Sequence, residues 1–180
     1  KMLAAELTSD ALAAAFEKHR REIDGTRLRA SHIILRPDPA RGADALPALI
    51  RKAEEIRREI LKGTISFAEA ARRHSAGPSR RQGGDVGFFP RHGVLHEDFA
   101  REAFALAKGD VSKPFATPSG VHILTVTGIE PGNGTPEGLR PQLEKMVVQK
   151  VVSGLLDRGR SSTKITYAPG VARSEEHTSE

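Results

Sequence analysis

The stretch Gln82-Gly83-Gly84-Asp85-Val86-Gly87-Phe88-Phe89-Pro90 places three glycines within five residues. Glycine is needed where the chain turns through a positive φ or where two backbones approach closely, so the stretch predicts a tight turn. Asp85 lies inside this turn, where its carboxylate can accept hydrogen bonds from neighbouring amides. Two of the seven phenylalanines of the chain follow at once. A turn that brings apolar rings to one place predicts a small, shaped pocket.

Two predicted strands, each with a histidine, flank this turn in the sequence. Residues 28–36 alternate with the two-residue period of a strand, and His32 lies on the apolar face; residues 121–129 place His122 in the same way. A histidine on an inward face is most often a core group satisfied by one hydrogen bond. Two of them beside the glycine turn can instead form a polar network under a pocket. Hydroxyl groups lie nearby in the sequence at Ser31, Thr117 and Ser119.

The other periodic segments predict an α+β domain of about four strands flanked by helices. The expected helices cover residues 10–24, 47–62, 66–74, 97–106 and 139–159. Further strands are expected at 86–89, 113–117 and 163–168. The two outermost helices resemble halves of a second, helical unit that the core interrupts.

Composition excludes several classes of protein. The 180 residues are 38% hydrophobic and 28% charged, which is typical of a globular chain, and they contain no cysteine. The chain contains no run of about 18 apolar residues, so no membrane span is predicted. The net charge of +5 comes largely from arginine pairs without interleaved aromatic residues, so no nucleic-acid partner is expected. The chain opens on Lys1, which suggests an excised piece whose signal peptide or anchor would not be visible.

The common catalytic motifs are not found. His92 and His96 are separated by Gly93, which disfavours a helix with both on one face. His32 and His122 would supply two metal ligands, but no third ligand accompanies them. No metal or other cofactor is therefore expected. Ser119, His122 and Asp85 form a triad on paper, but no nucleophile elbow G-x-S-x-G accompanies it. The segment 83–87 lacks the lysine of a phosphate-binding loop.

Four blocks, in order, resemble the signatures of the parvulin peptidyl-prolyl cis–trans isomerases. They are Arg29-Ala30-Ser31-His32-Ile33-Ile34-Leu35, Gly83-Gly84-Asp85-Val86-Gly87-Phe88-Phe89, the helix from Phe99 to Leu106, and Ser119-Gly120-Val121-His122-Ile123-Leu124. The flanking helices resemble those of SurA/PrsA-type foldases. The resemblance implies a parvulin-like (FKBP-like) domain with a small antiparallel or mixed sheet at residues 27–131. Residues 1–26 and 132–173 would then belong to a chaperone domain, and 174–180 resemble translated adapter sequence and would form an unstructured tail.

The resemblance also implies the site. His32 and His122 match the paired active-site histidines, with Thr117 and Ser119 as their hydroxyl neighbours. An apolar cup for the substrate proline is implied at Val86, Phe89, Leu95 and Phe99. Gly77 stands where the family often has Cys or Asp, which implies reduced activity.

The function implied is isomerisation of X-Pro bonds in unfolded, proline-containing clients outside the cytoplasm. The alternative is a weak or inactive parvulin-like module that only holds unfolded chains.

Overall fold

The computed structural model describes residues 7–37 and 45–162, the last five of them as backbone only. Within these ranges, no helix is both long enough and apolar enough to cross a membrane. The helices are α2 (Ser9–Ile23), α3 (Ala45–Leu61), α4 (Phe67–His74), the 3-10 helix η2 (Pro78–Gln82), α5 (Glu97–Phe104) and α6 (Arg140–Ser162). The strands are β1 (Arg27–Leu35), β2 (Asp85–Pro90), β3 (Phe115–Thr117) and β4 (Gly120–Glu130).

The four strands form one antiparallel sheet in the order β2-β1-β4-β3. The two histidine-bearing strands are therefore neighbours at its centre, although about ninety residues separate them in the sequence. Pairing of Ile34 with His122 and of His32 with Leu124 brings both imidazoles to one end of the β1–β4 ladder. The predicted α+β class with a four-stranded sheet is confirmed.

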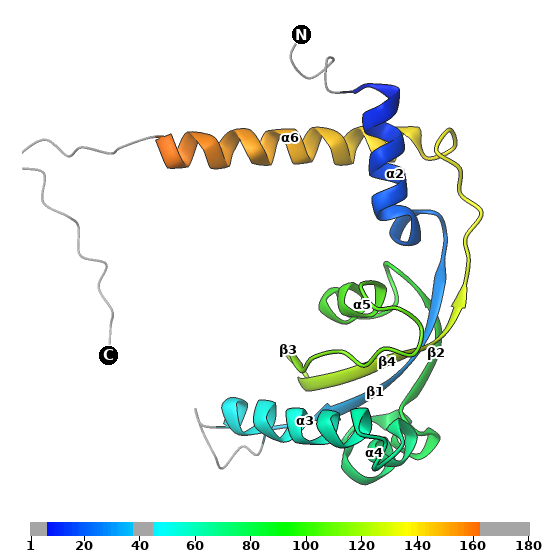
Figure 1. The fold of residues 1–180 in the computed structure, drawn as a ribbon, viewed down its shortest axis with the longest axis vertical. Helices are drawn as coiled ribbons and strands as arrows, with labels where there is room; N and C mark the ends of the chain where they lie inside the picture. Colours follow the sequence, from blue (N-terminus) through cyan, green and yellow to red (C-terminus); the bar gives the residue numbers. More distant parts are fainter. Residues whose placement is uncertain (1–6, 38–44, 163–180) are drawn as a thin grey trace, which may run out of the picture. The chain divides into compact units, whose positions relative to one another are not determined.

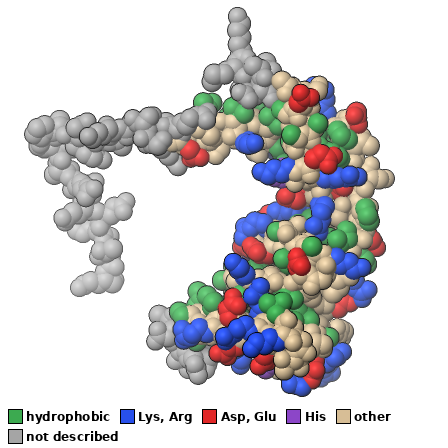
Figure 2. All heavy atoms as spheres, in the orientation of Figure 1, with side chains coloured by type: hydrophobic (Ala, Val, Ile, Leu, Met, Phe, Trp, Pro, Cys, Tyr) green, Lys and Arg blue, Asp and Glu red, His purple; other side chains and the backbone are tan. Residues whose placement is uncertain are grey.

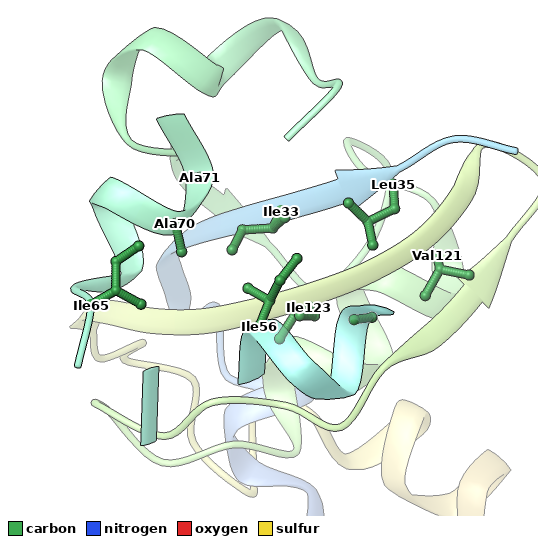
Figure 3. Packing of buried hydrophobic residues seen from close by; sticks show 9 residues of the cluster. Ile33, Leu35, Ile56, Ile65, Ala70, Ala71, Val121 and Ile123 are labelled. Atoms are coloured by element: carbon green, nitrogen blue, oxygen red, sulfur yellow. The ribbon is translucent and has the colours of Figure 1, made fainter. Parts of the chain in front are cut away.

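Helices cover both faces of the sheet (Figure 1). On one face, α3 and α4 pack on side chains such as Ile33 and Ile123, both fully buried (Figure 3). On the other face, α5 packs on a cluster that includes Leu28, Ala30, Leu124 and Val126. The period-2 pattern thus divides each central strand between two cores, and the histidines belong to the α5 side.

Local sequence signals explain where the helices beside the site begin. The hydroxyl of Ser66 accepts the Glu69 N–H at 3.2 Å, which is the N-cap hydrogen bond at the start of α4. Before α5, Nδ1 of His96 accepts the Asp98 N–H at 3.3 Å. That cap sets the first turn of the helix that carries Phe99.

The sheet is antiparallel, which is one of the two arrangements expected; a single parallel bridge, Lys108 to Val126, lies outside the named strands of the described residues. Several predicted boundaries of elements were wrong. β3 begins at Phe115 instead of 113, because Pro114 has no N–H for a ladder. α5 ends at Phe104. α6 passes through Gly159 to Ser162, since one helical glycine costs only ~1 kcal/mol. The strand expected at 163–168 lies outside the described residues.

The chain divides into two compact units, Phe16–Leu139 and a unit that combines Lys1–Ala15 with Arg140–Glu180. The first holds the sheet and the site. The exact boundaries predicted at 26 and 131 stay predictions.

Candidate active site

The glycine turn holds β1 and β2 in place around His32. Gly84 has a φ of 85°, and a Cβ on it would lie 2.3 Å from the backbone oxygen of His32. The His32 N–H also donates to the Gly84 oxygen at 2.9 Å. Only glycine permits both the positive φ and this approach, so the turn sets the position of the His32 backbone.

Asp85 connects the turn to β1. Its carboxylate accepts the Gly87 N–H at 3.0 Å, as the turn pattern predicted, and it accepts a further pair of hydrogen bonds from Nε of Arg29, each at 3.2 Å. Nη2 of Arg29 is a third donor. These hydrogen bonds stabilise the ionised form and hold the pKa of Asp85 below its usual value.

Two imidazoles and a group of phenyl rings meet above the centre of the sheet. The His32 and His122 rings stack with centroids 5.7 Å apart, and Phe99 meets them edge-on at 5.5 Å and 6.0 Å. Phe115 stacks on His122 at 5.4 Å. Edge-to-face contacts at these distances are favourable for aromatic rings. The geometry brings together groups from β1, β3, β4 and α5.

Hydroxyl groups complete the cluster at the β3–β4 turn. Thr117 Oγ1 lies 2.8 Å from Nε2 of His122 and also accepts the Ser119 N–H at 3.1 Å. The Ser119 side chain is exposed. The predicted association of Thr117 with a histidine is therefore present, while Ser119 contributes through its backbone.

Burial keeps both histidines neutral. Desolvation lowers the pKa of His32. For His122, desolvation together with the nearby His32 and His96 lowers the pKa to about 4. Nδ1 of each ring is buried and has no hydrogen-bond partner among the described residues. The pair thus provides neutral rings inside a mostly apolar wall at pH 7.

The apolar residues expected to form a cup occupy different depths. Phe89 is only 1% exposed and lies behind Phe99, with centroids 5.9 Å apart. Val86 and Leu95 are partly buried and pack against the same cluster. Phe89 therefore packs behind Phe99, which is itself only 5% exposed, while Val86 and Leu95 are partly exposed.

Gly77 approaches His32 from a loop that extends the edge of β1. The Ala76 N–H donates to the Ile34 oxygen at 2.8 Å, and the buried Ser75 hydroxyl accepts the Ile34 N–H at 3.2 Å. A Cβ on Gly77 would lie 3.3 Å from Nε2 of His32. The position singled out in the sequence is therefore adjacent to the histidine pair.

A separate surface cavity of about 310 Å³ lies at the end of the sheet, beside the N-terminus of α3. Its lining residues are Pro37, Ala45, Leu46, Leu49, Thr117, Pro118 and Gly120. Only Thr117 is shared with the histidine cluster. The candidate site is the histidine cluster, because polar groups and apolar rings converge there.

The sequence reading missed three residues around the site. Phe115 shares a strand face with Thr117, so the two-residue period would have found it. The buried Ser75 and Arg91 gave no sequence signal, because their burial depends on how other elements pack around them. Nη1 of Arg91 donates to Glu97 at 2.9 Å and so ties the end of β2 to the start of α5.

Comparison with known proteins is consistent with this geometry. Residues 32–128 match the rotamase family described as "PPIC-type PPIASE domain". Pin1 of Digitalis lanata, a peptidyl-prolyl cis–trans isomerase, is 33% identical over 57% of this chain and 97% of its own length. The foldase protein PrsA of Bacillus subtilis is 32% identical over 69% of this chain. The solved isomerase ESS1 of Candida albicans superposes with a TM-score of 0.53 at 29% identity, covering 66% of this chain and 74% of that one.

The chain belongs to the PPIC-type, or parvulin, peptidyl-prolyl cis–trans isomerase family. The predicted relation to the PrsA and SurA foldases is also confirmed. The chain spans only 37% of the length of PrsA from Bacillus subtilis. The function of the two outer segments, residues 1–26 and 132–173, is therefore not shown by these relatives.

Proposed function

We propose that the chain isomerises X-Pro peptide bonds in extended or unfolded polypeptides outside the cytoplasm. The observation that carries the proposal is the convergence of His32, His122 and Phe99 from three separate elements. Relation to the PrsA and SurA foldases supports unfolded clients and an extracytoplasmic location.

Rotation about a peptide bond is slow because the twist destroys amide resonance, at a barrier of ~18–20 kcal/mol. No covalent step is required. A site that binds the twisted form more tightly than the planar forms lowers this barrier, and each ~1.4 kcal/mol of difference gives a tenfold rate. In our proposal Leu95 and Phe99 hold the proline ring, with Val86 and Phe89 as the floor. An apolar wall also removes water from the carbonyl and so disfavours the charge-separated planar amide.

The polar groups of the site would then fix its shape. The hydrogen bond between Thr117 and His122 holds that ring against Phe115, and the backbone of Ser119 orders the hydroxyl. Because both imidazoles are neutral at pH 7, they add no buried charge that would have to be solvated. Gly77 leaves the His32 edge of the site without a side chain.

The test follows the slow, proline-limited phase of refolding of a client protein in the presence of catalytic amounts of this chain. Acceleration in proportion to enzyme concentration is expected. An unchanged slow phase would exclude the enzymatic function.

A second function, holding unfolded chains without isomerisation, is favoured by a different observation. Helix α6 exposes Val152, Leu155 and Leu156, by 41%, 38% and 60%, and apolar side chains are visible on its surface in Figure 2. Suppression of client aggregation without any rate on X-Pro bonds would support this function. It also predicts that Gly77→Cys or Gly77→Asp restores activity by supplying a missing polar group.

A further inference from the structure

Gly77 is a glycine for reasons of packing, not of backbone conformation. Its φ of −81° and ψ of 160° are open to any L-residue. A Cβ there would lie 2.9 Å from Cγ2 of Ile34, closer than real Cβ contacts, and 3.3 Å from Nε2 of His32. Any side chain at this position would therefore cover the ring nitrogen. Glycine keeps Nε2 of His32 open.

The loop that carries Gly77 is tied to β1, so it cannot easily move aside for a larger residue. The buried hydroxyl of Ser75 accepts two N–H groups, from Ile34 and from Gly77, each at 3.2 Å. Ala76 donates to the Ile34 oxygen at 2.8 Å. Breaking these bonds would leave buried polar groups without partners, which is unfavourable.

The hydrogen-bonding state of His32 follows from its surroundings. Burial lowers its pKa, so the ring is neutral at pH 7 and carries one hydrogen. Nδ1 is buried and has no partner in the described part of the chain. A hydrogen on Nδ1 would be buried without an acceptor, whereas one on Nε2 lies on the side that Gly77 leaves uncovered, so the arrangement favours the Nε2–H tautomer. Nε2 makes no hydrogen bond within the described part of the chain and is not fully buried, so an N–H at this position is available to a ligand.

We propose that the Nε2–H of His32 donates a hydrogen bond to the prolyl nitrogen as the X-Pro bond twists, an inference that rests on the proposed isomerase function. In the planar amide the nitrogen lone pair is delocalised and accepts poorly; in the twisted state it becomes localised and accepts well. A donor at this point stabilises the transition state without stabilising either ground state. A proline held against Phe99 lies beside this donor, because the two rings are 5.5 Å apart.

Gly77 is then part of the catalytic arrangement and not a defect in it. The experiment compares kcat and KM of Gly77→Ala, His32→Gln and His32→Phe on a proline-containing peptide. We expect Gly77→Ala to lower kcat by about tenfold to a hundredfold, the scale of losing one preorganised donor, with KM within about twofold. His32→Gln, which keeps an N–H donor, should retain more kcat than His32→Phe, which keeps only a ring.

A spectroscopic measurement tests the tautomer independently of activity. Nitrogen-15 NMR of His32 in the wild-type chain should show the hydrogen on Nε2 at neutral pH. A hydrogen on Nδ1 would overturn the inference, as would an unchanged kcat in Gly77→Ala. Should Gly77→Ala fail to fold, equal kcat values for His32→Gln and His32→Phe would overturn it. In each of these cases, an active wild-type chain would still support the proposed isomerase function. An inactive wild-type chain would contradict both that function and the inference about His32.

Discussion

Phe99 of α5 has a ring that contacts the histidines of both β1 and β4. Its ring contacts those of His32, His122, Phe89 and Phe115 at centroid distances of 5.5 to 6.2 Å. Phe104 lies on the same helix and is equally buried, but among these rings it contacts only Phe89. The two phenylalanines therefore share a core role and differ in their access to the site.

Replacing Phe99 by leucine should separate activity from stability. Phe99→Leu and Phe104→Leu keep most of the apolar volume, so each should lower the free energy of unfolding by about 1 kcal/mol. Only Phe99→Leu should reduce kcat/KM, by about tenfold or more. Denaturant unfolding and peptide isomerisation would measure the two effects. Equal losses of activity in both variants would contradict the assignment of Phe99 to the substrate cup.

His122 should make the fold sensitive to acid. Its pKa is lowered from 6.5 to about 4, so protonation favours the unfolded chain. The stability that it contributes is complete above pH 6.5 and is lost progressively as the pH falls toward 4. Denaturant unfolding across this range should show a steeper loss in the wild-type chain than in His122→Gln. The variant keeps a shallower loss, because the pKa of His32 is lowered too. Parallel pH profiles would exclude this role.

At the scale of elements, Gly84 and Gly87 of the glycine turn are alike in conformation and different in surroundings. Gly84 and Gly87 have φ values of 85° and 74°. A Cβ on Gly84 would meet the His32 oxygen at 2.3 Å, whereas nothing lies within 4 Å of one on Gly87. Gly84 lies where the turn meets the β1 backbone, whereas Gly87 only turns the chain.

The two alanine variants should therefore differ in size of effect. Gly87→Ala carries only the cost of the left-handed conformation, about 1 kcal/mol. Gly84→Ala adds a backbone clash worth a further ~1–3 kcal/mol and should displace β1 at His32. Unfolding free energies measure the first difference, and the NMR shifts of the His32 ring measure the second. Similar stabilities of the two variants would show that β1 and β2 can separate without cost.

At the scale of the whole molecule, the sheet and the site belong to one compact unit, while the two chain ends form another. The unit Phe16–Leu139 contains every residue placed in the candidate site. The exposed apolar side chains of α6 belong to the other unit. We therefore expect the two proposed activities, isomerisation and holding of clients, to reside in different parts of the chain.

A fragment of residues 9–139, which keeps α2 intact, tests this division. It should retain the peptide isomerase rate of the full chain within about twofold, because a site contained in one unit needs no other. It should lose most of any suppression of client aggregation. Light scattering of an aggregating client measures the second property. A fragment that suppresses aggregation as well as the full chain would assign that activity to the isomerase unit instead.

The sequence alone was enough to predict the class of fold, because alternation of apolar and polar residues is a local property. The glycine turn, the two histidine strands and the capped α4 helix could all be recognised from residues a few positions apart. The family was likewise predicted from short blocks in order. Phe99, His32 and His122 could be named as candidates by the same means.

Only the tertiary structure showed how these residues meet. The pairing of β1 with β4 stacks the two imidazoles, and the register of the sheet places Phe115 beside His122. The closeness of position 77 to the His32 ring depends on a loop held by the hydrogen bond of Ser75 with Ile34, which is 41 residues away in the sequence. Such contacts depend on long-range packing and on burial, which set distances and pKa values, and no local pattern in the chain encodes them.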